Sequence, residues 1–267
     1  MLGVAQSRLP KPLNTSIILF KTTIRTSESM KINAKTLHNF LNKVTIRGNM
    51  TDGLLRFGPD GLSVSLKDVS NTGFSSGLLK TSAGFIDYKQ MVAPVKNMAK
   101  LLNFLKSISG TIELDVVGND LIITSADNNG RFKLAEEQYL ECNLEKFPNF
   151  AEHDSGFEVD TKVLVTAKSN ASTLGFKFVY ANVSGGEFYL TAGEDEFDQL
   201  TAHAKVDYKD VARTMYASIL LDFIGVIDGK ATVAFNQDYP LLITVSTVDS
   251  ILKWVVAPMT QPKEESE

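Results

Sequence analysis

The side chains that most often carry out catalysis are few in this sequence and stand in no catalytic spacing that we recognise. The three histidines, His38, His153 and His203, are far apart, and none belongs to an HExxH pair or to another spacing of metal ligands. A P-loop and a GxGxxG nucleotide loop are both absent from the sequence. The acidic run at residues 194–198 lacks the fixed spacing of a calcium loop. We therefore expect no enzymatic activity, no catalytic residues, no bound metal and no cofactor.

The chemistry that the sequence does offer is positive charge on one side of three segments with helical spacing. In each segment lysine and small polar residues lie opposite the apolar stripe, and no acidic residue lies at the centre of the polar face. Such a face can hold the phosphate backbone of a nucleic acid without reading its bases. The candidate residues are Lys35, His38, Asn42 and Lys43 in the first segment, Lys96, Lys100, Asn103 and Lys106 in the second, and Lys162 and Lys168 in the third.

Helices must position these residues, and the apolar spacing predicts them. The first helix is predicted over residues 33–46, where Asn33 is the expected N-cap and apolar residues recur at i, i+3, i+4 and i+7. The same spacing predicts a second helix over residues 95–108 and a third over residues 160–171. Their polar faces are the segments described above.

A fourth helix, predicted over residues 216–227, departs from this pattern. Ile219, Phe223 and Val226 stand where basic residues would be expected. Lys209 and Arg213, just before this helix, are the candidates for phosphate contact in its place.

Short segments with alternating or β-branched apolar residues, separated by Gly, Asn and Asp, predict antiparallel strands. Together with the helices they predict an α+β fold, in which an antiparallel sheet is covered on one face by two helices. The predicted strands cover residues 53–57, 61–66, 111–116, 120–124 and 131–134 in the first half, and 176–181, 187–192, 200–206, 230–235, 241–245 and 252–256 in the second.

The two halves of the chain repeat one another. Residues 30–37 (MKINAKTL) align with residues 157–164 (FEVDTKVL), and residues 102–110 (LNFLKSISG) align with residues 221–229 (LDFIGVIDG). Residues 121–124 (LIIT) then align with residues 241–244 (LLIT) in the same order. The repeat predicts two duplicated domains of similar fold.

The composition predicts a soluble cytoplasmic protein whose two terminal segments differ from the folded domains between them. The longest apolar runs are too short to cross a bilayer, and the single cysteine, Cys142, cannot form an internal disulfide. Residues 1–29 carry a net charge of +3. Since the whole chain carries −4, the remaining residues carry −7. We expect residues 1–29 to be a flexible leader and residues 261–267 an acidic disordered tail. Residues 30–141 and 157–260 are then the domains, joined by a linker over residues 142–156.

The end of the sequence resembles a known family. Asp238-Tyr-Pro-Leu241, followed by Trp254-Val-Val-Ala-Pro258, resembles the end of DNA sliding clamps of the proliferating cell nuclear antigen type, and the first half is equally similar to phage clamps. This resemblance implies a homotrimeric ring of six similar domains that encircles duplex DNA and acts as a polymerase processivity factor. It also implies that DNA polymerase and the clamp loader dock through short peptides, and that no membrane is involved.

The resemblance also implies two further surfaces. In the family, peptides dock between the interdomain linker and the C-terminal residues, which here implies Leu144, Phe147, Pro148, Phe150, Pro240, Val255, Ala257 and Pro258. Subunits join through edge strands, which implies Arg131, Phe132, Lys133 and Leu134 of one chain beside Glu187, Phe188, Tyr189 and Leu190 of the next. Val255 replaces an aromatic residue of the family, so the partner peptides are not predicted.

Two other readings remain open at this stage. One is a processivity or transcription accessory factor that shares the fold but acts as a monomer. The other is a β-rich interaction or virion protein without a DNA role, which the acidic composition and the apolar fourth helix would fit.

Overall fold

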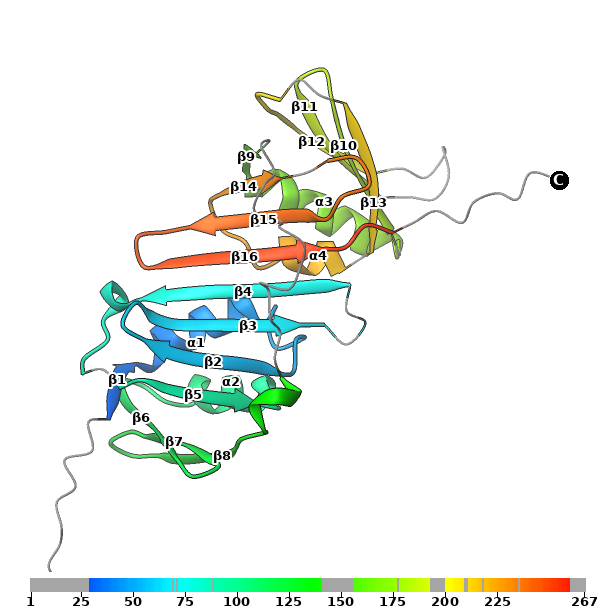
Figure 1. Ribbon diagram of the computed structural model, residues 1–267. Coiled ribbons are helices and arrows are strands. Elements are labelled where there is room, and N and C mark those ends of the chain that lie inside the picture. The colour runs from blue at the N-terminus through cyan, green and yellow to red at the C-terminus, as the bar shows by residue number, and fades with distance from the viewer. Residues whose placement is uncertain are drawn as a thin grey trace, which may run out of the picture.

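The computed structural model describes residues 29–259 except 69, 71, 88, 141–155, 177, 193–199, 209–210, 218 and 235. The described chain consists of antiparallel sheets with a few helices, which confirms the predicted α+β class. In Figure 1 the two halves stand side by side, and the helices lie on one side of the long central sheet. No described helix is long and apolar enough to span a membrane.

The elements follow the same order in both halves. The first half comprises β1 (Met30–Asn33), α1 (Ala34–Val44), β2 (Gly53–Gly58), β3 (Gly61–Lys67), β4 (Gly73–Lys80), β5 (Met91–Val95), α2 (Met98–Lys106), β6 (Thr111–Val117), β7 (Asp120–Thr124) and β8 (Asn129–Lys133). The second comprises β9 (Gly156–Asp160), α3 (Thr161–Leu174), β10 (Phe178–Ser184), β11 (Glu187–Ala192), β12 (Leu200–Lys205), β13 (Ala212–Ala217), α4 (Ile219–Ile224), β14 (Lys230–Ala234), β15 (Leu241–Ser246) and β16 (Ser250–Val256).

The strands form three sheets, and the largest is shared by the two halves. Its order is β5-β2-β3-β4-β16-β15-β14-β9, so that β4 of the first half pairs with β16 of the second. The order β1-β6-β7-β8 forms a four-stranded sheet at one end, and β12-β11-β10-β13 forms another at the other end. Each half therefore contributes four strands to the common sheet and keeps four of its own.

The sequence repeat corresponds to a structural repeat. Asn33 caps α1 and Asp160 caps α3, and each side-chain oxygen accepts hydrogen bonds from backbone N–H groups of the first turn. The next residues, Ala34 and Thr161, each donate their N–H over 2.9 Å to the carbonyl of a glycine, Gly110 and Gly229 respectively. Both glycines have positive φ angles, +83° and +85°, at equivalent positions of the repeat.

The junction between the halves is tightly packed. Across the pairing of β4 with β16, Ser75 lies opposite Trp254, which is completely buried. The Ser75 hydroxyl donates to the carbonyl of Val44, at the end of α1, over 2.6 Å. A Cβ on Gly77 would come within 2.9 Å of the Phe40 ring, so glycine allows α1 to lie directly on β4.

Several predicted boundaries were wrong. The second helix begins at Met98 rather than residue 95, because Asn97 caps it and residues 91–95 form β5. The fourth helix begins at Ile219, because Tyr216 lies in β13. The sequence analysis did not predict β4, which forms half of the junction, or β1, β5, β9 and β13. Apolar residues in β4 and β5 do not alternate cleanly, since both of these strands are largely buried on both faces.

Candidate functional site

The four helices form one row along the central sheet. Helix α2 packs on α1, and α4 packs on α3. Helices α1 and α4 both contact β16 at the junction, and Lys43 on α1 contacts Asp228, just after α4. The order of the row is therefore α2, α1, α4, α3, and its solvent face carries most of the predicted phosphate-binding residues.

Five predicted lysines on this row are exposed, and none of them has an acidic partner within the described part of the chain. Asn103 is also exposed, while His38 and Asn42 are half-buried. Exposed, unpaired ammonium groups are available to phosphate oxygens. The five are Lys35 on α1, Lys96 just before α2, Lys100 and Lys106 on α2, and Lys162 on α3.

Two further predicted lysines are already paired with acids. The Lys43 ammonium lies 2.9 Å from Oδ2 of Asp228, which follows α4. The Lys168 ammonium lies 3.5 Å from Oδ1 of Asp222 on α4. Both acidic partners lie on α4 or in the turn after it. The sequence analysis identified the lysines but did not pair them with these acids.

Arg47 is a third cation at the same place, and the sequence analysis missed it. Its guanidinium Nη2 donates to the carbonyl of Gly225, at the C-terminal end of α4, over 2.8 Å. Ile46 and Arg47 have positive φ angles of 53° and 59°, which turn the chain sharply after α1. No periodicity in the sequence signals such a turn.

Helix α4 offers little to a phosphate backbone. Phe223 and Val226 are buried in the core, so the apolar residues noted in the sequence serve packing. Asp222 is the charged residue of this helix. The expectation that the fourth helix differs from the other three agrees with this arrangement.

Arg213 does not lie on the helix row. It is on β13, where its neighbours Ala212 and Thr214 are buried in the core, so its side chain points to the opposite face of the sheet. There its guanidinium lies 4.7 Å from the centroid of the Tyr180 ring. The structure therefore places Arg213 away from the helix row, and Lys209 lies outside the described residues.

A second surface lies on the face of the central sheet opposite the helices. Val255 on β16 faces Phe74 on β4 across the junction, and both are largely buried without belonging to the main core. Pro240 and Ala257 each lie one residue beyond the pair Leu241–Val256, which brings them together. The predicted floor residues are therefore neighbours.

Hydrogen bonds hold this floor in place. The Ala257 N–H donates to the Thr72 carbonyl over 2.8 Å, and Pro258 forms a β-bridge with Tyr216. The Tyr216 hydroxyl donates to the Tyr239 carbonyl over 2.6 Å, and burial raises its pKa. Phe74 is a residue that the sequence analysis missed, because β4 was not predicted. Leu144, Phe147, Pro148 and Phe150 lie outside the described residues.

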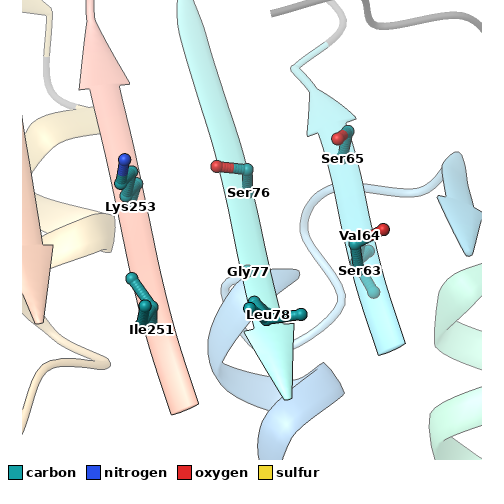
Figure 2. A pocket seen from close by; sticks show the side chains of 8 residues that line it. All are labelled: Ser63, Val64, Ser65, Ser76, Gly77, Leu78, Ile251 and Lys253. Atoms are coloured by element: carbon teal, nitrogen blue, oxygen red, sulfur yellow. The ribbon is translucent and has the colours of Figure 1, made fainter. Parts of the chain in front are cut away.

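Further along the junction the same face is hollowed. A pocket of about 280 Å³ lies over β3, β4 and β16, and Figure 2 shows the side chains that line it. Lys253 and Ser76 line it from opposite sides of the junction and occupy paired positions. The other lining residues are Ser63, Val64, Ser65, Gly77, Leu78 and Ile251.

Among the described residues, β8 and β12 are the edge strands of the two end sheets that pair with no further strand, whereas the other edge strands, β1 and β13, form single bridges with Ile86 and Pro258. On β8, Arg131 and Lys133 are exposed and Phe132 is half-buried, with its ring 5.3 Å from that of Phe104 on α2. The Arg131 guanidinium lies 2.5 Å from Oδ2 of Asp120 and lowers the pKa of that carboxyl through their hydrogen bond. Leu134 lies just beyond β8, where it forms a bridge with Val95.

The second half of the predicted subunit contact is wrong. Strand β11, with Glu187, Phe188, Tyr189 and Leu190, lies between β10 and β12, so neither of its edges is free. Phe188 and Leu190 are also buried in the core. Glu187 accepts a short hydrogen bond from the Tyr189 hydroxyl within the same strand. The free edge is β12, one strand further along the chain.

A GxSxG pattern does occur at residues 73–77, although the sequence analysis expected none, but it does not form a nucleophile turn. Ser75 lies in the middle of β4 rather than in a turn before a helix. It is buried, and its hydroxyl donates to the Val44 carbonyl. No group of three or more His, Cys, Asp or Glu residues that could hold a metal ion occurs among the described residues.

Comparison with known proteins gives matches in structure but no match in sequence. No protein-family model and no curated protein matches the sequence. The proliferating cell nuclear antigen (PCNA) of Entamoeba histolytica superposes with a TM-score of 0.71 at 15% identity, covering 87% of this chain and 99% of that one. The PCNA2–PCNA3 complex of Sulfolobus tokodaii gives 0.69 at 15%, covering 87% and 100%.

A third solved structure is A. fulgidus PCNA bound to the C-terminal region of FEN-1. It superposes with a TM-score of 0.71 at 16% identity and covers 88% of this chain and 99% of that one. These matches span nearly the whole of the described chain and include both halves. The chain therefore has the two-domain fold of the PCNA-like sliding clamps, as its last residues had suggested.

Proposed function

We propose that this protein is a sliding clamp, which closes into a ring around duplex DNA and holds a polymerase on its template. The observation that supports this proposal most strongly is that the two unpaired edges, β8 and β12, are the repeats of the two strands that pair at the junction within the chain. Strand β8 occupies the place of β16 in its half, and β12 occupies the place of β4. Strand β8 of one chain can therefore pair with β12 of the next chain in the same way that β16 pairs with β4 within one chain.

The repeat also predicts the register of this contact. Thr124 pairs with Asn129 as Thr244 pairs with Lys253, so Asn129 is equivalent to Lys253. Glu187 pairs with Lys205 in the second half, and Gly61 pairs with Lys80 at the equivalent place in the first half, so Lys205 is equivalent to Lys80. Thr201 on β12 and Ser76 on β4 each lie four residues before these lysines and are therefore equivalent to each other. Since Lys253 pairs with Ser76, Asn129 of one chain should pair with Thr201 of the next.

A contact between two different edges is heterologous, so it builds either a closed ring or an open filament. The sliding-clamp fold favours the closed ring. Because the rings of this family contain six similar domains, two domains per chain favour a ring of three chains. Such a ring would place the helix row around its hole, where exposed lysines face the phosphates.

Assembly can be tested with a disulfide. We expect Asn129→Cys and Thr201→Cys, combined in one chain with Cys142→Ser, to give covalent species of up to three chains on oxidation. Ser76→Cys with Lys253→Cys is the matched control, because that pair should close within one chain. Light scattering of the unmodified protein should give a mass of three chains. A stable monomer that forms no cross-link would instead indicate the monomeric accessory factor.

Binding of DNA can be tested topologically. A closed ring should stay on circular duplex and slide off after the circle is cut, because free ends release a topological link. Equal retention on circular and linear DNA would contradict encirclement. Complete absence of retention, with a proven ring and a loading factor supplied, would favour an interaction protein without a DNA role.

The face opposite the helices is the proposed docking surface for short peptides of a polymerase and a clamp loader. Val255 and Phe74 form its apolar floor, and Pro240, Ala257 and Pro258 lie beside them. We expect Val255→Glu to abolish capture of such peptides while the mass in solution stays unchanged. Val248→Glu, at a highly exposed position between β15 and β16, is the matched control for the change of charge.

A further inference from the structure

Three cross-strand pairs point away from the helices along the junction of β4 with β16. Alternate residues of a strand face the same side of a sheet, and the residues between these pairs, among them Ser75 and Trp254, face the helices. The three pairs are apolar, polar and apolar in turn. In order along β4, the junction pairs are Phe74 with Val255, Ser76 with Lys253, and Leu78 with Ile251.

The middle pair carries a cation without a counter-ion. Lys253 is exposed, and no acidic group of the described residues lies within salt-bridge distance of its ammonium group. Strand pairing continues its row through Ser76 to Ser65 on one side. On the other side the first acid of the row, Glu158, lies three strands away and is paired with Lys230. The Lys253 side chain therefore lines the pocket beside hydroxyl groups and lacks an anion.

The pocket over the middle pair is suited to one acidic side chain. Its volume of about 280 Å³ is at the small end of the volumes of whole small-molecule sites, about 300–1,000 Å³. Ser65 and Ser76 supply hydroxyl groups, Lys253 supplies an ammonium group, and Leu78 and Ile251 form an apolar wall (Figure 2). A carboxylate accepts hydrogen bonds from both kinds of donor, and its bond to an ammonium group is charge-assisted.

The spacing of the junction pairs matches that of an extended peptide. Successive pairs are two residues apart along each strand, which separates them by about 6.6 Å at about 3.3 Å per residue. Side chains on one side of an extended peptide repeat at the same distance. A peptide that lies along the junction therefore places its first, third and fifth side chains over the three pairs in turn.

We propose that the docking surface of this protein selects peptides in which an acidic residue stands between two apolar residues at alternate positions, apolar-x-acidic-x-apolar. The carboxylate enters the pocket and accepts hydrogen bonds from Lys253 and Ser76. The two apolar residues pack on the apolar pairs on either side. This inference rests on the proposed docking surface and names the class of peptide that it takes. The pattern is symmetric, so it holds for either direction of the peptide.

The acidic end of the chain itself is the competing occupant. Residues 260–267 (TQPKEESE) follow Met259, whose N–H donates to the Met215 carbonyl over 2.8 Å. This segment contains three glutamates but no Leu, Ile, Val, Met or aromatic residue. It can supply a carboxylate but not the two apolar side chains, which favours a peptide of a partner protein.

Selection from a library of short random peptides displayed on phage tests the pattern. On the immobilised full-length protein, we expect enrichment of Asp or Glu two positions from an apolar residue on both sides. On the Lys253→Gln variant, the apolar residues should still be enriched and the acidic residue should not. Enriched peptides that lack the acidic residue, or that keep it on Lys253→Gln, would overturn the proposal.

The affinity of one enriched peptide measures the contact. Replacing its acidic residue by the corresponding amide should weaken binding about two- to tenfold, as measured by fluorescence anisotropy. Lys253→Gln should weaken binding of the acidic peptide by a similar factor and leave binding of the amide peptide unchanged. Circular dichroism verifies that each variant is folded.

Lys67→Gln is the matched control. Lys67 is exposed and pairs with Phe74, so it faces the same side of the sheet, but it lies outside the pocket. This variant removes the same charge and should change the affinity for the acidic peptide much less than Lys253→Gln. An equal loss would show that the peptide responds to the overall charge of this face and not to the pocket.

Deletion of residues 260–267 tests the competing occupant. The enriched pattern should stay the same after the deletion. A preference for acidic residues that appears only after the deletion would assign the pocket to the end of the chain itself.

The possible outcomes also separate this proposal from the clamp. Peptides whose capture survives Val255→Glu would contradict the docking surface as a whole. A protein that forms the cross-linked ring and stays on circular DNA, but shows no preference for acidic peptides, would contradict the pocket alone.

Discussion

The ring of Phe40 on α1 lies over Gly77 on β4, so close that a Cβ at Gly77 would come within 2.9 Å of its Cζ atom. Leu252 on β16 also lies at this point, 3.0 Å from the same hypothetical Cβ. Phe40, Gly77 and Leu252 therefore join a helix, the last strand of the first half-sheet and the first strand of the second. This contact fixes the helix row relative to the strands that carry the docking surface.

Replacement of Gly77 by Ala should destabilise the protein by about 1 to 3 kcal/mol, because the added methyl group overpacks this contact. Chemical denaturation measures the effect. Gly58→Ala is the matched control, since no atom lies within 4 Å of its hypothetical Cβ, and it should change the free energy of unfolding little. Equal effects of the two substitutions would show that α1 does not press on β4.

The single tryptophan should report unfolding of both halves at once. Trp254 is fully buried in the shared sheet, so its fluorescence should change only when the junction opens. Because the sheet runs through both halves, we expect the fluorescence transition to coincide with loss of far-UV circular dichroism. A fluorescence change that precedes the circular dichroism change would show that the halves separate before they unfold.

The two helix caps should contribute alike. Asn33→Ala and Asp160→Ala each remove a side-chain acceptor from the first turn of a helix and should each cost about 1 kcal/mol of stability. Thermal unfolding measures both. Asn39→Ala, at an exposed position inside α1, is the control and should be neutral or slightly stabilising.

Acid should loosen the free edge at β8. Arg131 hydrogen-bonds the Asp120 carboxylate and lowers its pKa in the folded protein. The ion pair therefore contributes stability above the unfolded pKa, about 3.9, and this contribution is lost as pH falls through the lower folded value. Hydrogen exchange of the β7–β8 amides, corrected for intrinsic rates, should show protection that declines below about pH 4.

Asp120→Asn provides the comparison for this pH effect. It should have weaker protection of β7–β8 at neutral pH and a flatter response to acid, because the titrating carboxyl is absent. If the variant responds to acid as the unmodified chain does, another group controls the edge.

Local features were predictable from the sequence because they depend on neighbours along the chain. Apolar spacing located α1 and α3, and the cap at Asn33 follows from its side chain and its place before an apolar stripe. Most of the strands were predicted to within a few residues. The repeat was visible because equivalent positions of both halves have the same packing, turn and capping requirements, as Gly110 and Gly229 show.

Tertiary structure decided which of these features act together. Spacing showed that Lys43 and Lys168 are on polar helix faces, but their acidic partners follow more than fifty residues later and meet them only after folding. It did not show that β4 pairs with β16, that Arg213 lies on the far side of a strand, or that β12 rather than β11 is the free edge. Pairing of strands and the choice of face depend on contacts between segments distant in sequence, and local periodicity carries no record of those contacts.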